Sequence, residues 1–127
     1  MSINPFEHPL FIYSKNPRHK GELEHFTHIG SKGNPSCGDE VVFYVRVKNG
    51  RIEAISFEGR GCSVSQASAD MLAEWVIGKT VEEISKLTDD AFLEEVIGGV
   101  IPTRIRCALV SLQALRKALE KKTNSQV

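Results

Sequence analysis

The middle of the chain alternates hydrophobic and polar positions with the two-residue period of a β-strand. Residues 41–47 are rich in β-branched and aromatic side chains, and residues 51–58 alternate polar with apolar side chains. Asn49 and Gly50, which separate these segments, form a sequence typical of a two-residue hairpin turn. The pattern therefore predicts an antiparallel hairpin.

A shorter segment of similar character precedes the hairpin. We expect residues 24–29 to add a first strand beside it, and residues 10–13 to belong to a short helix that ends before Pro17. Three residues that break regular structure mark a loop after the first strand, namely Gly30, Gly33 and Pro35.

The hydrophobic period changes to that of a helix after Gly61. Apolar residues at helical spacing predict a helix over residues 63–77, which Gly78 would end. Thr80 and Glu83 have the spacing of a capping box and predict a short helix to about Lys86.

The remaining part of the chain predicts two more helices. Thr88 is placed to cap a short one, and Gly98 with Gly99 breaks the chain again. Leucines at helical spacing predict an amphipathic helix from about residue 103 to 122, followed by a frayed tail at 123–127.

The order of elements, strands first and helices afterwards, is typical of an α+β domain. We therefore expect residues 1–127 to form a single domain, with a small antiparallel three-stranded sheet and helices packed on one face of it. A chain of 127 residues is long enough to bury a hydrophobic core.

Charge and composition exclude several classes of function. Sixteen basic and sixteen acidic residues cancel, so no charge excess indicates binding to nucleic acid or to an anionic membrane. We find neither an apolar run long enough to cross a bilayer nor a secretory signal, and expect a cytoplasmic protein. Thiols stay reduced in that compartment, so a disulfide framework is not expected.

Three cysteines carry the candidate chemistry of the chain. Cys37 lies between Pro35 and Gly38, and Asp39 follows two positions later. A thiol in such a loop is poorly placed to fill a core, although a single cysteine taken alone is more often a small buried apolar residue. Asp39 is also of a type that caps turns.

The other two cysteines are expected at the start of helices. Cys62 follows Gly61 at the junction between a strand and a helix, and Cys107 follows Pro102 near the start of the last helix. A helix N-terminus lowers the pKa of a thiol and favours the thiolate. Arg106 adds positive charge next to Cys107.

Together these residues have the composition of a four-coordinate site. Three thiolates and one carboxylate, from Cys37, Asp39, Cys62 and Cys107, would bind zinc or an iron–sulfur cluster. The histidines at 8, 19, 25 and 28 have the ordinary interpretation of surface residues, and a ligand role is left open for His25 and His28.

Five segments follow one another in the order found in a known family. They are Tyr13 with Asn-Pro-Arg at 16–18, Asn-Pro-Ser-Cys-Gly-Asp at 34–39, Gly-Cys-Ser-Val-Ser-Gln-Ala-Ser at 61–68, Trp-Val-Ile-Gly-Lys at 75–79 and Pro-Thr-Arg-Ile-Arg-Cys at 102–107. They resemble the IscU/NifU-type iron–sulfur scaffold family, including its zinc-bound SufU branch, and the resemblance covers nearly the whole chain.

The resemblance implies an IscU/SufE-like fold and a scaffold rather than an enzyme. Such a scaffold accepts persulfide sulfur from a cysteine desulfurase, assembles a [2Fe–2S] cluster and transfers it to apoproteins. The implied ligands are Cys37, Asp39, Cys62 and Cys107, with Cys107 as the preferred persulfide acceptor and Cys37 as the second choice. A cluster shared within a homodimer would also suit this set.

Two positions depart from the family pattern. Arg106 stands where the IscU branch has histidine, and arginine stays protonated and is no ordinary metal ligand. SufU members also lack that histidine, but they usually carry an insertion between the second and third cysteines, and here that interval is short. Scaffolds served by an Hsp70-type chaperone carry Pro-Val-Lys, and this chain has Pro102-Thr103-Arg104 instead.

Three functions therefore remain open at the level of sequence. The first is a cluster scaffold, and the second is a SufU-like sulfurtransferase that binds Zn²⁺ with the same four residues. The third is a small domain with a structural zinc site.

Overall fold

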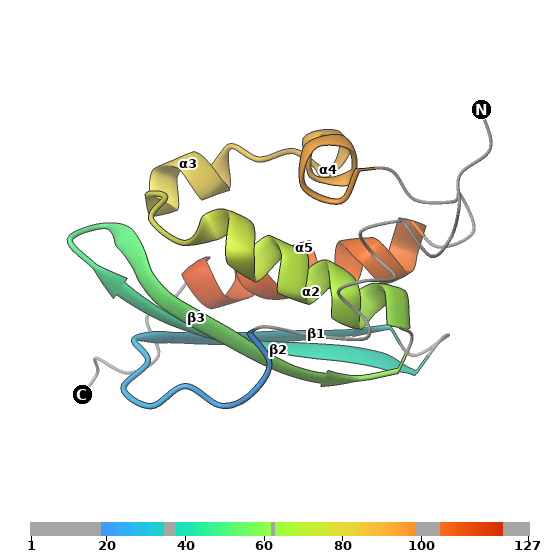
Figure 1. Ribbon diagram of the computed structural model, residues 1–127, viewed down its shortest axis with the longest axis horizontal. Helices are drawn as coiled ribbons and strands as arrows, with labels where there is room; N and C mark the ends of the chain where they lie inside the picture. The colour runs from blue at the N-terminus through green and yellow to red at the C-terminus, as the bar shows by residue number, and fades with distance from the viewer. Residues whose placement is uncertain (1–18, 35–37, 62, 99–104, 121–127) are drawn as a thin grey trace.

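The computed structural model describes residues 19–34, 38–61, 63–98 and 105–120. Three strands form an antiparallel sheet in the order β1-β2-β3, with β1 at His28–Asn34, β2 at Asp39–Lys48 and β3 at Arg51–Arg60. The helices are α2 (Ser63–Val76), α3 (Val81–Ser85), α4 (Asp89–Ala91), the π-helix η1 (Phe92–Val96) and α5 (Ile105–Glu120). All of them lie on one face of the sheet (Figure 1), which confirms the expected α+β architecture.

The predicted hairpin is confirmed. Strands β2 and β3 pair from Glu40 opposite Arg60 to Lys48 opposite Arg51. Asn49 and Gly50 have φ angles of 55° and 76°, so both turn residues adopt the left-handed conformation that a type I′ turn requires.

The predicted position of the first strand was wrong. Strand β1 begins at His28, four residues later than expected, and continues through Gly30 and Gly33, which the sequence pattern placed in a loop. The reason lies in the helix above it. A Cβ atom at Gly30 would collide with the backbone of Ala118 in α5, so this glycine permits close packing of a strand against a helix.

The helices begin and end close to the predicted positions. Gly78, with φ of 87°, follows α2, and the Thr80 and Glu83 side chains form the predicted capping box at the start of α3. The Thr88 hydroxyl accepts a hydrogen bond from Ala91 N at the start of α4. In the described part of the chain, we find no helix that is both long and apolar enough to cross a membrane. The predicted helix at 10–13, Pro102 and the tail at 123–127 lie outside the described residues.

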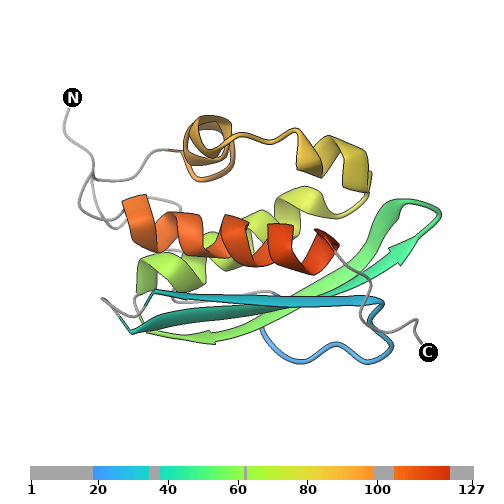
Figure 2. The ribbon, with the colours of Figure 1, turned by 180° about the vertical axis from the view of Figure 1, so that it is seen from behind.

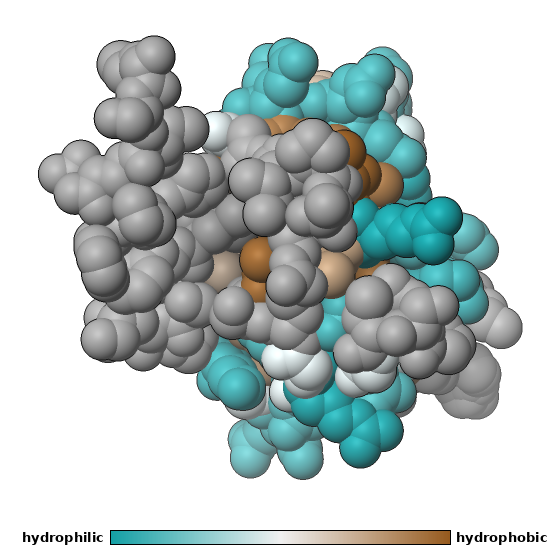
Figure 3. Space-filling model, turned by 90° about the vertical axis from the view of Figure 1, so that its right-hand side faces the viewer, coloured by the Kyte–Doolittle hydropathy of each residue, from teal (hydrophilic) through white to brown (hydrophobic). Residues whose placement is uncertain are grey.

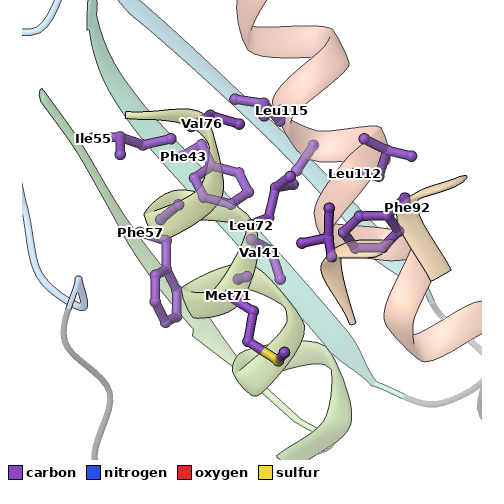
Figure 4. Close-up of a cluster of buried hydrophobic side chains, with 14 of the residues drawn as sticks. Val41, Phe43, Ile55, Phe57, Met71, Leu72, Val76, Phe92, Leu112 and Leu115 are labelled. Carbon is purple, nitrogen blue, oxygen red and sulfur yellow. The ribbon is translucent and has the colours of Figure 1, made fainter. Parts of the chain in front are cut away.

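The hydrophobic core lies between the sheet and the helices (Figure 4). Its largest fully buried side chains include Phe43 and Phe57 from the sheet, Leu72 from α2 and Phe92 from η1. Helix α2 is the central helix, since every residue from 67 to 73 is buried.

Residues 19–21 cover the outer edge of β3. The N–H of Gly21 donates to Phe57 O at 2.7 Å, and Phe57 N–H donates to His19 O at 2.9 Å. The buried carboxylate of Asp70 in α2 accepts a hydrogen bond from His19 N–H at 2.6 Å. A buried acid in the central helix therefore positions the chain that lies beside β3.

Candidate metal centre

The segments that carry the candidate ligands, or lie next to them in sequence, are at the same end of the molecule. Strand β2 begins there, β3 ends there, and both α2 and α5 begin there, on the right of Figure 1 and on the left of Figure 2. The antiparallel sheet brings the start of β2 next to the end of β3, and the short interval between Arg60 and Ser63 keeps the start of α2 at the same end.

Asp39 is the first residue of β2 and points toward the helices. Side chains alternate between the two faces of a strand, and Asp39 shares its face with Val41, Phe43 and Val45, which are fully buried. The side chain of Asp39 is itself only 3% exposed. A carboxylate so placed costs free energy unless its charge is compensated, and a metal ion is one way to compensate it.

Gly61, the residue before Cys62, packs directly against Asp39. Its φ angle is 106°, and a Cβ atom there would lie 2.5 Å from Asp39 Oδ1 and 2.9 Å from the carbonyl oxygen of Gly38. Gly38 directly follows Cys37 in the sequence, and Gly61 directly precedes Cys62. The described chain thus brings together the neighbours of two cysteines and the aspartate.

Cys107 is the third residue of α5, where the sequence placed it. Its side chain is 1% exposed, whereas Arg106 beside it is exposed to solvent. The first turn of a helix carries N–H groups without partners in the helix, and these favour a thiolate.

Two of the four candidate ligands, Cys37 and Cys62, lie outside the described residues, as does Arg104. Among the residues that are described, no three His, Cys, Asp or Glu side chains are close enough to bind one metal ion. The complete four-residue site therefore stays a prediction. What the structure contributes is a buried carboxylate, a buried thiol and two glycines at one end of the fold.

Some apolar side chains of described residues are visible at the end that would carry the site. Seen directly from this side (Figure 3), small areas of apolar surface appear among the described residues, with hydrophilic surface to the right of and below them. An apolar surrounding strengthens electrostatic interactions between a cation and its ligands, because less water screens them.

His25 and His28, for which the sequence left a role as metal ligands open, lie away from Asp39. His28 begins β1, and this strand ends at Asn34, about 20 Å away at the rise of an extended chain. His25 precedes it in the chain, and its φ of 58° turns the backbone before the strand. Neither residue is positioned to bind a metal ion together with Asp39.

Gln66 also belongs to this end of the molecule, although it is not among the candidate residues of the sequence. Its side-chain nitrogen donates to the carbonyl oxygen of Arg60 at 3.1 Å and, at 3.5 Å, to that of Glu40. These carbonyl groups belong to the ends of β3 and β2. The signals in the sequence are the place of Gln66 in the segment 61–68 and its position one helical turn after Cys62.

These features define a class of protein. It is a small α+β domain with a carboxylate and a thiol, both candidate metal ligands, at one end of the sheet on the side covered by the helices. The NifU-like N terminal domain family matches residues 8–126, and the chain belongs to this family. The iron-sulfur cluster assembly scaffold protein IscU 1 of Archaeoglobus fulgidus is 39% identical over 110 residues, which are 87% of this chain and 71% of the relative.

A second relative and a solved structure belong to the SufU branch. The zinc-dependent sulfurtransferase SufU of Bacillus subtilis is 34% identical over 88% of this chain and 87% of its own. FiSufU of Fervidobacterium islandicum AW-1, a crystal structure, is 32% identical and superposes with a TM-score of 0.75 over 92% of this chain and 96% of its own. Relatives of both branches are thus similar to this chain in sequence, and the SufU-type structure shares its fold.

Proposed function

We propose that this chain is a scaffold for the assembly of iron–sulfur clusters. The observation that supports it most is the contact of Gly61 with Asp39 and Gly38, because it joins the segments of Cys37 and Cys62 around a buried carboxylate. The name of the Archaeoglobus fulgidus relative, an iron–sulfur cluster assembly scaffold protein, agrees with this proposal.

The proposed ligands are Cys37, Asp39, Cys62 and Cys107, and the cargo is a [2Fe–2S] cluster. Three thiolates suit the soft iron–sulfur core, and the carboxylate of Asp39 is a harder and weaker ligand for it. A site with one weaker ligand holds a cluster during assembly and still permits its transfer to an apoprotein.

Sulfur would come from a cysteine desulfurase, with Cys107 as the first acceptor and Cys37 as the second. The acceptor thiolate attacks the outer sulfur of the donor persulfide, so that one S–S bond forms while the other breaks and the donor leaves as a thiolate. Because Cys107 is 1% exposed, this transfer requires that its side chain be uncovered first. Mass spectrometry after incubation with a desulfurase tests the order, and a persulfide on another cysteine but not on Cys107 would contradict it.

A second candidate function is a zinc-dependent sulfurtransferase. Two observations favour it, namely Arg106 in place of the histidine of the IscU branch and the similarity to SufU of Bacillus subtilis. Here Zn²⁺ would be bound by the same four residues, and one thiolate would leave the metal to accept sulfur. The partner would again be a cysteine desulfurase.

Metal and sulfide analysis of protein purified without oxygen separates the two candidates. Iron together with acid-labile sulfide is the result expected of a cluster scaffold. Stoichiometric zinc without sulfide, combined with sulfur transfer from a desulfurase, would support the sulfurtransferase instead. Aerobic purification must be avoided, because zinc can replace a labile cluster.

A further inference from the structure

Gln66 connects three elements at the end of the molecule that carries Asp39. It lies in the first turns of α2, and its Nε2 lies 3.1 Å from Arg60 O, 3.2 Å from Ser65 Oγ and 3.5 Å from Glu40 O, so that its two N–H groups are shared among three acceptors. Glu40 directly follows Asp39, and Arg60 directly precedes Gly61. One side chain thus joins the start of α2 to the two strand ends beside the candidate site.

The chemistry of its partners fixes the orientation of this amide. Carbonyl oxygens only accept hydrogen bonds, so the atom facing those of Arg60 and Glu40 must be the nitrogen. The other atom, Oε1, is buried and accepts no hydrogen bond from a described residue. The contacts of Gln66 with the strand ends therefore depend on Nε2 alone.

Gly59 provides the space in which the amide lies. A Cβ atom at Gly59 would be 2.7 Å from Gln66 Oε1, 2.9 Å from its Nε2 and 2.5 Å from the carbonyl oxygen of Glu40. Any side chain here would displace the amide. The two glycines of the segment thus serve different contacts, because Gly59 accommodates Gln66 whereas Gly61 accommodates Asp39.

We propose that Gln66 is a positioning residue for the metal centre. Its hydrogen bonds hold the backbone on both sides of the contact between Asp39 and Gly61, and so fix the carboxylate relative to the chain that continues into Cys62. Without Nε2 the two strand ends separate more readily, and the ligands adopt the geometry for binding less often. This inference rests on the proposed function, since it concerns the same four ligands.

Gln66→Met tests the proposal, because it keeps the length of the side chain and removes the donor. We expect the affinity for Zn²⁺, measured by competition with a chelator on the full chain, to fall about 10-fold or more, as for other residues that orient metal ligands. With Co²⁺ as a probe, the visible bands of a tetrahedral site should weaken at equal occupancy. Gln113→Met, the same change on α5, is the matched control and should leave both unchanged.

Hydrogen exchange of the metal-free protein tests the strand ends without any metal. In Gln66→Met, amides of residues 39–41 and 59–61 should exchange faster, while those of the hairpin turn at 48–51 should exchange as in the parent. Faster exchange at both places would indicate general destabilisation and would contradict a positioning role. Thermal unfolding of both variants completes the comparison.

The outcomes separate this inference from the proposed function. If the parent binds Zn²⁺ and Gln66→Met binds it equally well, the positioning role is wrong and the proposed function stands. If the parent binds neither Zn²⁺ nor a reconstituted cluster, the proposed function is wrong and the positioning role falls with it. An equal loss of affinity in Gln113→Met would also overturn the positioning role.

Discussion

Asp39 differs from the three cysteines in the hardness of its donor atoms. It is buried, it faces the helices, and the backbone of Gly61 lies against its Oδ1 atom. A carboxylate in this place adds negative charge to the site without adding a strong bond to an iron–sulfur core.

Replacing this carboxylate should slow the loss of the cluster. In Asp39→Ala the weakest of the four proposed ligands is absent, and we expect a more persistent cluster held by the three thiolates. The decay of the visible absorbance of the reconstituted protein measures this, with the exposed Asp90→Ala as control. Faster decay in Asp39→Ala than in the parent would contradict the proposed role of Asp39.

Gly61 contributes to the geometry of this end through the atom that it lacks, because a Cβ atom there would collide with Asp39. In Gly61→Ala the new Cβ would press on Asp39 Oδ1 in addition to straining a backbone with φ of 106°. We expect a loss of about 1–3 kcal/mol in stability from the strain, together with weaker Zn²⁺ binding from the displaced carboxylate.

Gly50→Ala separates these two effects. Gly50 also has a positive φ, of 76°, but a Cβ atom there would meet no atom within 4 Å. The Gly50→Ala variant should therefore be less stable in chemical denaturation but bind Zn²⁺ with the affinity of the parent. Equal Zn²⁺ affinity in both variants would show that Gly61 serves the turn alone.

At the scale of elements, the packing of β1 against α5 depends on Gly30. A methyl group there would meet the backbone of Ala118, and a backbone cannot yield as the end of a side chain can. We expect Gly30→Ala to destabilise the fold by about 1–3 kcal/mol or more, as overpacking does. Gly33→Ala is the control in the same strand, since its Cβ would approach only to 3.3 Å from one oxygen. Similar denaturation midpoints for the two variants would argue against this packing.

The capping box of α3 predicts a dependence on pH. Hydrogen bonds from the backbone N–H and the hydroxyl of Thr80 lower the pKa of the Glu83 carboxyl below its usual 4.5. A carboxyl with a lower pKa in the folded state stabilises the fold above the unfolded pKa, and this contribution is lost as the pH falls through the folded value.

Glu83→Gln should therefore be less stable than the parent at neutral pH, and the difference should shrink below about pH 4. Urea denaturation at several pH values measures it. Glu82→Gln, which removes the other acid of the first turn and its exposed pair with Lys86 but leaves the capping box intact, serves as the control. A difference that stays constant down to low pH would mean that the charge of Glu83 does not contribute.

Local patterns predicted most elements but neither the position of β1 nor the π-helix η1. The hairpin, the capping box of α3 and the helix ends follow from residues that are close in sequence, such as Asn49 with Gly50 and Thr80 with Glu83. Gly30 was placed in a loop because glycine usually breaks strands, whereas here it allows a helix 88 residues later to lie close. No local pattern contains that information.

At the scale of the whole molecule, the hydrophobic core contains neither of the two described candidate ligands. Fully buried residues from the sheet, α2, η1 and α5 pack together between the layers (Figure 4). The two described candidates, Asp39 and Cys107, lie where β2 and α5 begin, at one end of this core.

Removal of the metal should therefore leave the fold in place. After chelation we expect the far-ultraviolet circular dichroism of a folded α+β protein and a cooperative thermal transition, at a midpoint lowered by the lost binding energy. Unfolding on chelation would instead identify a structural zinc site, because in such domains the energy of metal binding is the energy of folding.

The sequence by itself determined the fold class, the hairpin, the helices and the four candidate ligands, because each is encoded in short-range periodicity, turn residues or a compact motif. The tertiary structure alone decided three features. It placed Asp39 in the interior beside Gly61, it extended β1 beneath α5, and it positioned Gln66 over Gly59. These are contacts between residues distant in the chain, and their geometry exists only when the sheet and helices have packed together.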